Sequence, residues 1–206
     1  MIRVFGGWPT RSQRVTWLLE EMGIPYELRA VDIRSRAADS EFIDLNPAGF
    51  LPVLRDGDLT MVESIAIMEH LIARHGPSDL APAAGDPDHG PYQQFLHLGE
   101  AGLAVYLNIV VASRFFAPES EKENFGARVA VGMFFNRLAL VTRRLETSPY
   151  LAGARFTAAD ISVAYALEMG MRLGLGERYE AAVAAYLERL QSREAYRRAL
   201  ARSPPP

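Results

Sequence analysis

The apolar and polar positions at the start of the chain follow two different periods. Residues 2–7 and 26–33 are short apolar or alternating runs, which predict strands. Between them, apolar residues recur every three or four positions and predict a helix. Thr10 or Ser12 is a suitable N-cap for this helix, and Gly23 is a suitable stop. The chain therefore begins with a strand, a helix and a second strand.

The pattern continues with a hairpin and another helix. After a polar segment at 36–45 that is compatible with a short helix, residues 51–63 predict a β-hairpin with an Asp-Gly turn. Ser64 is expected to cap a helix over residues 64–75, whose apolar residues share one face. A βαβ unit joined to a ββα unit predicts a small mixed sheet with helices packed on it.

Strand signals disappear beyond residue 77. Residues 77–91 are dense in proline, glycine and aspartate and indicate a linker. Long helical patterns follow at 91–117, 119–147, 157–173 and 178–202, before the C-terminal sequence SPPP. We therefore expect an α/β domain over 1–77, a linker over 78–90 and an all-helical domain over 91–206.

The composition is that of an ordinary globular protein and excludes several kinds of chemistry. Of 206 residues, 49% are apolar and 23% are charged, and the net charge is −3 without a cluster of basic residues. Nucleic-acid binding is therefore not expected. The chain has no cysteine, which excludes disulfides, thiol nucleophiles and cysteine-ligated metals. Its four histidines are scattered at positions 70, 75, 89 and 97, so we expect no metal site.

The apolar runs do not predict a membrane-spanning segment. The longest, around residues 102–112, is interrupted by Asn108 and is shorter than the about 20 residues that a bilayer requires. The N-terminus leads straight into a strand and lacks the layout of a signal peptide. We expect a cytoplasmic protein without a membrane partner.

Pro52 is the unusual residue of the predicted hairpin. The run Leu51-Pro52-Val53-Leu54 has the composition of a buried strand, yet proline has no backbone N–H to give to a sheet. Taken alone, Pro52 fits an edge strand at a tight turn.

Several segments together give the whole chain a family resemblance. They are RVTWLLEEMGIPYEL at 14–28, NPAGFLPVL at 46–54, ES at 63–64 and FTAADISVAYAL at 156–167. In these motifs, and in its order of an α/β part and a helical part, the chain resembles the cytosolic glutathione S-transferase superfamily. The resemblance implies a thioredoxin-like βαβ-ββα domain followed by a helical bundle. Within the last motif, Thr157 and Asp160 match a capping box, which is a structural role.

The resemblance implies a glutathione site in the first domain. The Leu51–Pro52 bond would be cis, and the backbone of Leu51 would pair with the cysteinyl part of glutathione as an added strand does. Ser64 would hold the γ-glutamyl carboxylate at a helix start, and Glu63 the ammonium group. An ordinary N-cap would use the same geometry at Ser64. Phe50 stands where many relatives carry a lysine or glutamine for the glycyl carboxylate, so we expect weak affinity.

Glutathione transfer needs the thiolate form, and family members place a Tyr, Ser or Cys after the first strand to stabilise it. This chain has no cysteine and no tyrosine before Tyr26, which excludes two of these types. In the segment GGWPTRSQRV, Thr10 is the first candidate and Ser12 the second, while Arg11 would act on the sulfur through its charge. The alternative is that Thr10 only caps the helix and that the protein has no transferase chemistry.

The resemblance places the second substrate between the domains. The candidate wall residues are Trp8, Tyr106, Asn108, Val110, Phe115 and Phe116. Such a pocket suits flat apolar electrophiles, although aromatic residues at helical spacing also form ordinary core.

The leading interpretation is a homodimeric glutathione transferase that takes glutathione as co-substrate and uses no metal. Peroxide reduction or isomerisation by the same thiolate is also open. One alternative is a non-catalytic interaction module, like the stringent-starvation proteins that bind RNA polymerase or the transferase-like domains of elongation factors. Another is a ligandin-type carrier of apolar compounds. Tight binding of glutathione would argue against the interaction module.

Overall fold

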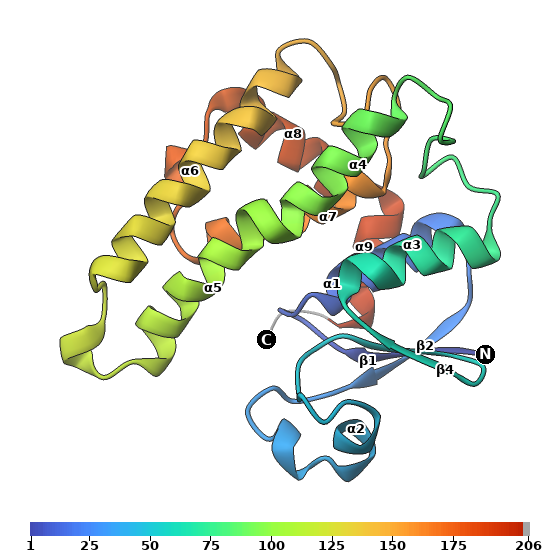
Figure 1. Ribbon diagram of the computed structural model, residues 1–206, viewed down its shortest axis with the longest axis horizontal. Coiled ribbons are helices and arrows are strands. Elements are labelled where there is room, and N and C mark those ends of the chain that lie inside the picture. The colour runs from blue at the N-terminus through green and yellow to red at the C-terminus, as the bar shows by residue number, and fades with distance from the viewer. Residues whose placement is uncertain (204–206) are drawn as a thin grey trace. The chain divides into compact units, whose positions relative to one another are not determined.

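The computed structural model describes residues 1–203 (Figure 1). The chain divides into two compact units, one of residues 1–78 together with 191–203 and one of residues 79–190. Every strand of the described chain belongs to the first unit. The last three residues, which we assigned to the helical domain, lie outside the described part of the chain.

The first unit is a four-stranded sheet with helices on both faces (Figure 1). Its elements are β1 (Ile2–Gly6), α1 (Ser12–Met22), β2 (Tyr26–Ala30), α2 (Ser40–Leu45), β3 (Val53–Asp56), β4 (Leu59–Val62), α3 (Ser64–His75) and α9 (Glu194–Arg202). The strand order is β2-β1-β3-β4, with β1 and β2 parallel and the other neighbours antiparallel. The predicted βαβ-ββα order and mixed sheet are therefore confirmed.

The central strand β1 is buried on both faces. Val4 and Phe5 are fully buried, although successive side chains of a strand point to opposite faces. Phe5 faces α2 and packs in one apolar cluster with Phe42, Leu51 and Val53. In Figure 1, α1 and α3 lie across the sheet from α2. This cluster fixes α2, and the chain that follows it, to the sheet.

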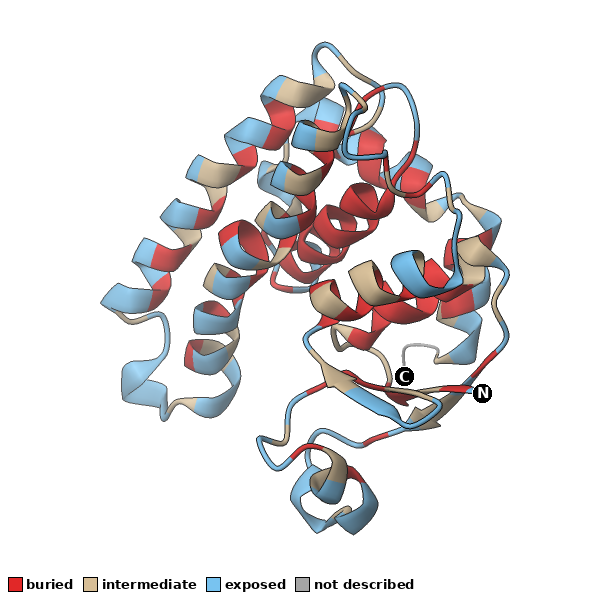
Figure 2. Cartoon of the chain, turned by 45° about the vertical axis from the view of Figure 1, so that its right-hand side comes forward, coloured by how far each residue is buried: buried red, intermediate tan, exposed pale blue. Residues whose placement is uncertain are grey.

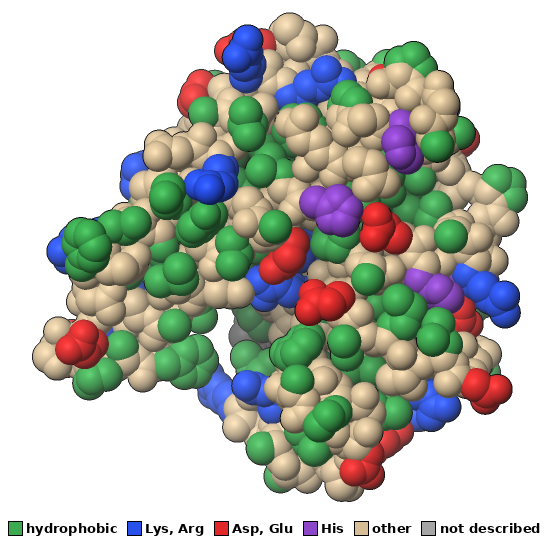
Figure 3. All heavy atoms as spheres, in the orientation of Figure 1, with side chains coloured by type: hydrophobic (Ala, Val, Ile, Leu, Met, Phe, Trp, Pro, Cys, Tyr) green, Lys and Arg blue, Asp and Glu red, His purple; other side chains and the backbone are tan. Residues whose placement is uncertain are grey.

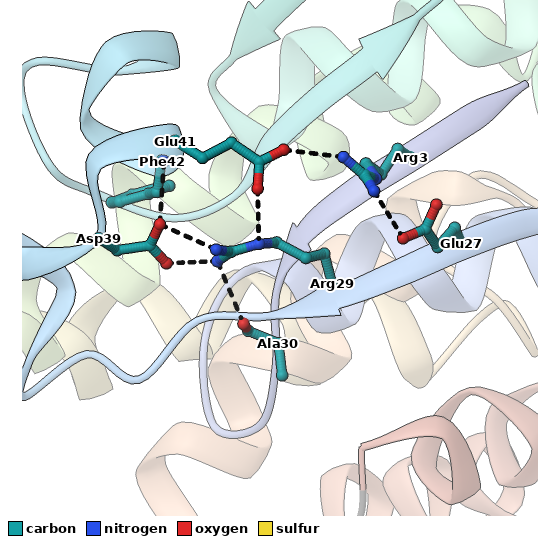
Figure 4. A network of polar contacts seen from close by, with 7 residues as sticks. All are labelled: Arg3, Glu27, Arg29, Ala30, Asp39, Glu41 and Phe42. Carbon is teal, nitrogen blue, oxygen red and sulfur yellow. Dashed lines mark hydrogen bonds and ion pairs between the residues drawn. The ribbon is translucent and has the colours of Figure 1, made fainter.

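A network of ion pairs ties α2 to the strands (Figure 4). The Nη2 atom of Arg29 lies 2.9 Å from Oδ1 of Asp39, and its Nε atom lies 3.2 Å from Glu41. Arg3 of β1 reaches Glu41 at 2.8 Å. Asp39 also caps α2, because Oδ1 accepts the N–H of Phe42 at 3.1 Å. The hydrogen bonds from Arg29 lower the pKa of Asp39, so the capping carboxylate stays charged.

The second unit is helical and is built around α7. Its helices are α4 (His89–His97), α5 (Val105–Val111), α6 (Phe125–Leu145), α7 (Ala158–Arg172) and α8 (Ala181–Gln191). Two stretches of π-helix, Leu98–Ala104 and Ala112–Phe116, extend α5 at both ends. Figure 2 shows that α7 is buried along almost its whole length. The predicted helical bundle is confirmed.

The start of α7 is the capping box that the sequence predicts. Asp160 is fully buried, and its Oδ2 atom accepts the N–H of Thr157 at 2.8 Å. Its Oδ1 atom accepts the hydroxyl of Tyr186 at 2.8 Å and the N–H of Leu151 at 3.0 Å. Burial raises the pKa of Asp160, and the hydrogen bonds donated to its carboxylate oppose that rise.

The single helix predicted over residues 178–202 is wrong, because the chain makes two helices there. Helix α8 ends at Gln191, and Arg193 is extended, with a ψ of 138°. Helix α9 then packs on α1 in the first unit. The domain boundaries drawn from the sequence placed residues 191–203 with the helical part, and the structure differs from them there.

The helix predicted over residues 119–147 starts later than expected. A short 3-10 turn follows Pro118, and α6 begins only at Phe125. Asn124 caps α6, because its Oδ1 atom accepts the N–H of Ala127 at 2.9 Å. Residues 119–124 (ESEKEN) carry no apolar side chain, so the apolar periodicity of this helix begins only with Phe125.

Two helical stretches of the second unit, residues 89–116 and 125–145, are long and apolar enough to cross a membrane by length and composition alone. Asn108 does not interrupt the first of them, which runs for 28 residues. Core helices of globular proteins pass the same test. Hydrophobic side chains gather on the outside of this hairpin (Figure 3). The exposed ones are Val105, Ile109, Phe115, Phe116, Phe125, Val129, Met133 and Leu140.

Candidate functional site

Three segments that carry predicted site residues meet at one end of the sheet. Phe5 of β1 pairs with Val53, the first residue of β3, and the last residue of β4 pairs with Val53 from the other side. Residues 7–12 leave β1 at this end, residues 51–52 enter β3 and residues 63–64 follow β4. The candidate activating residues and the candidate glutathione-binding residues are therefore at the same end of the sheet.

The loop after β1 is closed by two hydroxyl groups that bond to Gly7. The Oγ1 atom of Thr10 donates to the Gly7 carbonyl at 2.6 Å. The Oγ atom of Ser12 accepts the N–H of Gly7 at 2.8 Å and lies 3.1 Å from its carbonyl oxygen. The two hydroxyl oxygens are 2.7 Å apart. The predicted N-cap role is found only in part: Arg11 precedes α1 without a side-chain cap, while Oγ1 of Thr10 accepts the N–H of Ser12 at 3.4 Å.

Thr10 and Ser12 differ in their access to a ligand. Ser12 is 1% exposed and lies against Gly6, where an added Cβ would stand 2.3 Å from the Cβ of Ser12. Thr10 and the neighbouring Arg11 are partly exposed. Of the two hydroxyls, the one on Thr10 is the one that a ligand can approach.

Leu51 buries its side chain and leaves its backbone groups open. It packs in the apolar cluster under α2 and is 8% exposed. The bond between Leu51 and Pro52 is cis, and β3 begins only at Val53, so the strand predicted from Leu51 starts two residues later. Within residues 1–203, the N–H and C=O groups of Leu51 have no hydrogen-bond partner. Backbone N–H and C=O groups are strong hydrogen-bonding groups, so the pair on Leu51 is available to a ligand.

Asn46 holds the loop that leads to Leu51. It is 4% exposed, its Nδ2 atom donates to the carbonyl of Phe50 at 2.6 Å, and its Oδ1 atom accepts the N–H of Ala48 at 3.2 Å. Phe50 itself is exposed. This supporting role of Asn46 was not predicted from the sequence, because it depends on where the side chain points.

The start of α3 differs from the cap that the sequence predicts. Ser64 is the first helical residue, and Glu63 precedes it with a φ of 72° and no side-chain cap. The hydroxyl of Ser64 accepts a hydrogen bond from Nη1 of Arg14 at 3.2 Å, and Arg14 is fully buried. Arg14 was not predicted as a site residue, because it lies on the apolar side of α1, where an arginine is not expected. A buried cation thus lies beneath a helix N-terminus, which itself attracts anions.

Arg36 lies beside the loop that contains Phe50. A Cβ added to Gly49 would stand 3.9 Å from the Nε atom of Arg36, and Gly49 has a φ of 70° that suits glycine. The Arg36 guanidinium donates to the carbonyl of Ile33. The segment therefore offers a cation next to Phe50, which has no donor of its own.

Two of the four histidines share one carboxylate. The Oδ2 atom of Asp56 lies 3.1 Å from Nε2 of His70 and 2.9 Å from Nε2 of His75. Among the residues that the structure describes, no group of three or more histidine, aspartate or glutamate side chains is arranged to hold a metal ion.

The candidates for the second substrate lie in both units. Trp8 is partly exposed in the first unit, where its backbone N–H donates to Oγ of Ser203 at 2.7 Å. In the second unit, Arg137 lies over the ring of Tyr106 at 4.6 Å. The remaining candidates divide into the fully buried Val110 and the exposed Asn108, Phe115 and Phe116. Val110 therefore packs in the core of its own unit.

Comparison with known proteins gives matches along most of the chain. The model of the glutathione S-transferase N-terminal domain matches residues 10–74, and that of the glutathione S-transferase C-terminal domain matches residues 107–194. The chain is similar to glutathione S-transferase 3 of Schizosaccharomyces pombe, with 28% identity over 176 residues that cover 79% of this chain and 72% of the relative. It is similar to glutathione S-transferase 4 of Zea mays, with 33% identity over 154 residues that cover 72% of this chain and 68% of the relative.

A solved structure extends this similarity to the whole chain. The crystal structure of a glutathione transferase from Methylococcus capsulatus strain Bath matches with a TM-score of 0.86 and 25% sequence identity. The match covers 98% of this chain and 98% of that one.

Proposed function

This chain belongs to the glutathione S-transferase family, and we propose that it binds glutathione at the loop end of its sheet and ionises the thiol for attack on an apolar electrophile. The observation that carries the proposal is the unpartnered backbone of Leu51, at the same end of the sheet as Thr10 and Ser64. A peptide ligand is the natural partner for an N–H and a C=O presented together.

The cysteinyl part of glutathione would bind to Leu51. Its backbone N–H and C=O would pair with the two groups of Leu51, as a strand adds to a sheet edge. Asn46 would keep these groups in place through its hydrogen bond to Phe50. This pairing would leave the cysteinyl sulfur at the end of β1, where the Thr10 hydroxyl lies.

The γ-glutamyl end would bind at the start of α3. The first N–H groups of a helix have no partner within it, and they attract a carboxylate. Ser64 supplies a hydroxyl there, and the buried charge of Arg14 adds to the attraction. Glu63 is exposed and would take the ammonium group.

The glycyl carboxylate would bind to Arg36. This assignment replaces the donor that Phe50 lacks, since the guanidinium lies beside Gly49 on the same loop. Arg36 is exposed, so the pair would be screened by water and salt and would contribute modestly.

Thr10 would stabilise the thiolate, with Ser12 as its support. A free thiol has a pKa of about 8.5, so a hydrogen bond to sulfur is needed to favour the thiolate at neutral pH. For this bond, Thr10 would turn its proton from the Gly7 carbonyl to the sulfur. Ser12, whose oxygen is 3.1 Å from that carbonyl, would then donate to it instead. The exchange leaves each hydroxyl proton with an acceptor, and Arg11 would add a favourable charge.

Two further features of the proposal concern the second unit. Trp8, Tyr106, Asn108 and Phe115 remain the residues proposed to face the electrophile. The exposed apolar side chains of α5 and α6 support the proposed homodimer, since large exposed apolar patches mark interfaces. Sedimentation of the wild-type protein and of an Ile109→Asp variant tests the proposed homodimer. We expect the wild type to sediment as a dimer and the variant to dissociate more readily.

Turnover of the probe electrophile 1-chloro-2,4-dinitrobenzene with glutathione tests the proposed activation. We expect Thr10→Val, which keeps the shape but removes the hydroxyl, to lower kcat/KM at least about tenfold. Thr10→Ser is the matched control and should retain most of the activity. Wild-type turnover in Thr10→Val would contradict the role of Thr10. Binding of glutathione without ionisation of its thiol would point to a carrier or an interaction module instead.

A further inference from the structure

The end of α1 carries two carboxylates where negative charge is unfavourable. Glu20 and Glu21 lie in the last turn of α1, and the C-terminus of a helix repels anions. Their side chains are only 10% and 9% exposed, so water does little to offset this cost. The local sequence of α1 supplies no basic residue in this turn.

The arginines of the C-terminal segment supply the missing charge. Arg193 binds Glu21 with two hydrogen bonds of 2.6 and 2.8 Å. Arg198 donates to Oε2 of Glu20 at 2.8 Å and to its backbone carbonyl at 3.0 Å, and Arg202 lies 3.5 Å from Oε1 of the same residue. These pairs fix α9 alongside α1, as Figure 1 shows for the red and dark blue helices.

Aromatic packing adds to these ion pairs. The rings of Trp17 and Tyr196 meet edge to face with centroids 4.9 Å apart, and Trp17 is almost fully buried. Such contacts contribute beyond the area that they bury. The position of the residue that follows α9 is therefore determined by α1.

That residue is Ser203, and it contacts the activating loop. Its Oγ atom accepts the N–H of Trp8 at 2.7 Å. A Cβ added to Gly7 would stand 3.2 Å from the same oxygen. Ser203 also lines a cavity of about 10 Å³ with Gly7, Trp8 and Ser12, which leaves room for at most one water.

The hydrogen bond to Ser203 acts on the peptide unit that organises the two hydroxyls. The N–H of Trp8 and the C=O of Gly7 belong to one planar peptide group. Its carbonyl accepts from Thr10 at 2.6 Å and lies 3.1 Å from Oγ of Ser12. Gly7 has a φ of 148°, which suits a glycine, and it has no side chain that would restrict the rotation of this peptide. The carbonyl also accepts the backbone N–H of Thr10 at 2.9 Å, so the bond from Trp8 to Ser203 restrains the same peptide group from its N–H side.

We propose that Ser203 is a positioning residue for thiol activation, acting through the Gly7–Trp8 peptide on the hydroxyls of Thr10 and Ser12. The proposal rests on the proposed function, because it assigns a support to the residues that would ionise glutathione. It also gives α9 a role in the site, since the ion pairs with Glu20 and Glu21 deliver Ser203 to the loop from 195 residues away in sequence.

The test compares Ser203→Ala with Ser203→Thr, which keeps the hydroxyl, and with Ser148→Ala. The control removes a hydroxyl that donates to the carbonyl of Gly153 in the second unit. Two quantities are measured in each protein: the exchange rate of the Trp8 amide hydrogen, and the pKa of bound glutathione from thiolate absorbance. We expect Ser203→Ala to speed exchange about fivefold, as loss of one neutral hydrogen bond does. The ionisation constant of the bound thiol should then fall about fivefold, which raises its pKa. The KM for glutathione should change less than kcat.

The outcomes separate the two proposals. Rescue of exchange and of ionisation in Ser203→Thr, with no change in Ser148→Ala, supports the positioning role. Unchanged exchange in Ser203→Ala overturns it, and so does faster exchange with an unchanged thiol pKa, while the proposed function stands in both cases. If the wild-type protein does not ionise glutathione, the proposed function fails, and the positioning role fails with it even where the exchange responds.

Discussion

The helix starts at Ser64 and Thr157 combine the same residue types but use them differently. At α7, the carboxylate of Asp160 is turned inward and accepts hydrogen bonds from Thr157, Leu151 and Tyr186. At α3, Glu63 is exposed, makes no cap, and has a φ of 72°. The hydroxyl of Ser64 meets a buried arginine instead of the helix backbone.

This difference separates a structural helix start from one that is suited to a ligand. A closed set of hydrogen bonds, as in the box at α7, leaves nothing for a second molecule to bind. An N-terminus without a side-chain cap, next to the buried Arg14, leaves N–H donors for an anion. The two starts should therefore respond to mutation in opposite ways, one in stability and the other in binding.

The largest expected effect is at α7. Asp160→Ala removes a fully buried carboxylate and leaves several donors without an acceptor, so we expect the free energy of unfolding to fall by about 3 kcal/mol. Urea denaturation measures this loss, and glutathione affinity of the folded protein should be unchanged. A loss below about 1 kcal/mol would show that the hydrogen bonds at α7 are not the structural element we describe.

A smaller effect, on glutathione affinity and not on stability, is expected at α3. Ser64→Ala should lower glutathione affinity about tenfold, as loss of a hydrogen bond to a charged group does, and should cost less than about 1 kcal/mol of stability. Calorimetric titration with glutathione measures the affinity, and Ser162→Ala, on the buried side of α7, is a control for removing a buried hydroxyl. If Ser64→Ala unfolds the protein readily and binds glutathione normally, Ser64 is structural and the contrast with Thr157 is lost.

The smallest effect is expected at the other end of α3, where the strand residue Asp56 meets His70 and His75. Partial burial raises the pKa of Asp56, but hydrogen bonds from His75 and His70 lower it, and the net pKa is below the usual value. A folded-state pKa below the unfolded value of about 3.9 stabilises the protein above that pH, and this contribution is lost as the pH falls through the folded pKa. Asp56→Asn weakens the hydrogen bonds with the two histidines, so it should lower stability at pH 6 by about 1 kcal/mol and flatten its decline in acid.

Acid unfolding followed by circular dichroism measures that change. Glutathione affinity at neutral pH should be the same in Asp56→Asn and in the wild type, because Asp56 lies at the opposite end of β3 from Leu51. An acid transition identical to that of the wild type would contradict the assigned role of the two histidines.

The elements that the sequence predicted are those with local causes. The helix stop at Gly23, the Asp-Gly hairpin and the box of Thr157 and Asp160 each depend on residues a few positions apart. Gly23 has a φ of 65°, which is the left-handed conformation that a glycine stop uses. The open backbone at Leu51 could also be predicted, but only from the family motif, because the sequence around Pro52 alone fits an edge-strand proline.

The residues that sequence reasoning missed or misassigned depend on distant partners. Ser12 and Thr10 have the composition of an N-cap, and only the course of the loop shows that both hydroxyls bind Gly7. Arg14 interrupts an apolar helix face, and its partner Ser64 is 50 residues away. Beyond the break after α8, Arg193 and Arg198 pair with Glu21 and Glu20 of α1, more than 170 residues away in the sequence.

The central claim is that this protein binds glutathione and ionises its thiol. The most direct test is a titration of the wild-type protein with glutathione near neutral pH, followed by the ultraviolet absorbance of the thiolate. The account predicts a saturable rise, with a bound thiol whose pKa lies below the about 8.5 of a free thiol. No rise up to millimolar glutathione would contradict it.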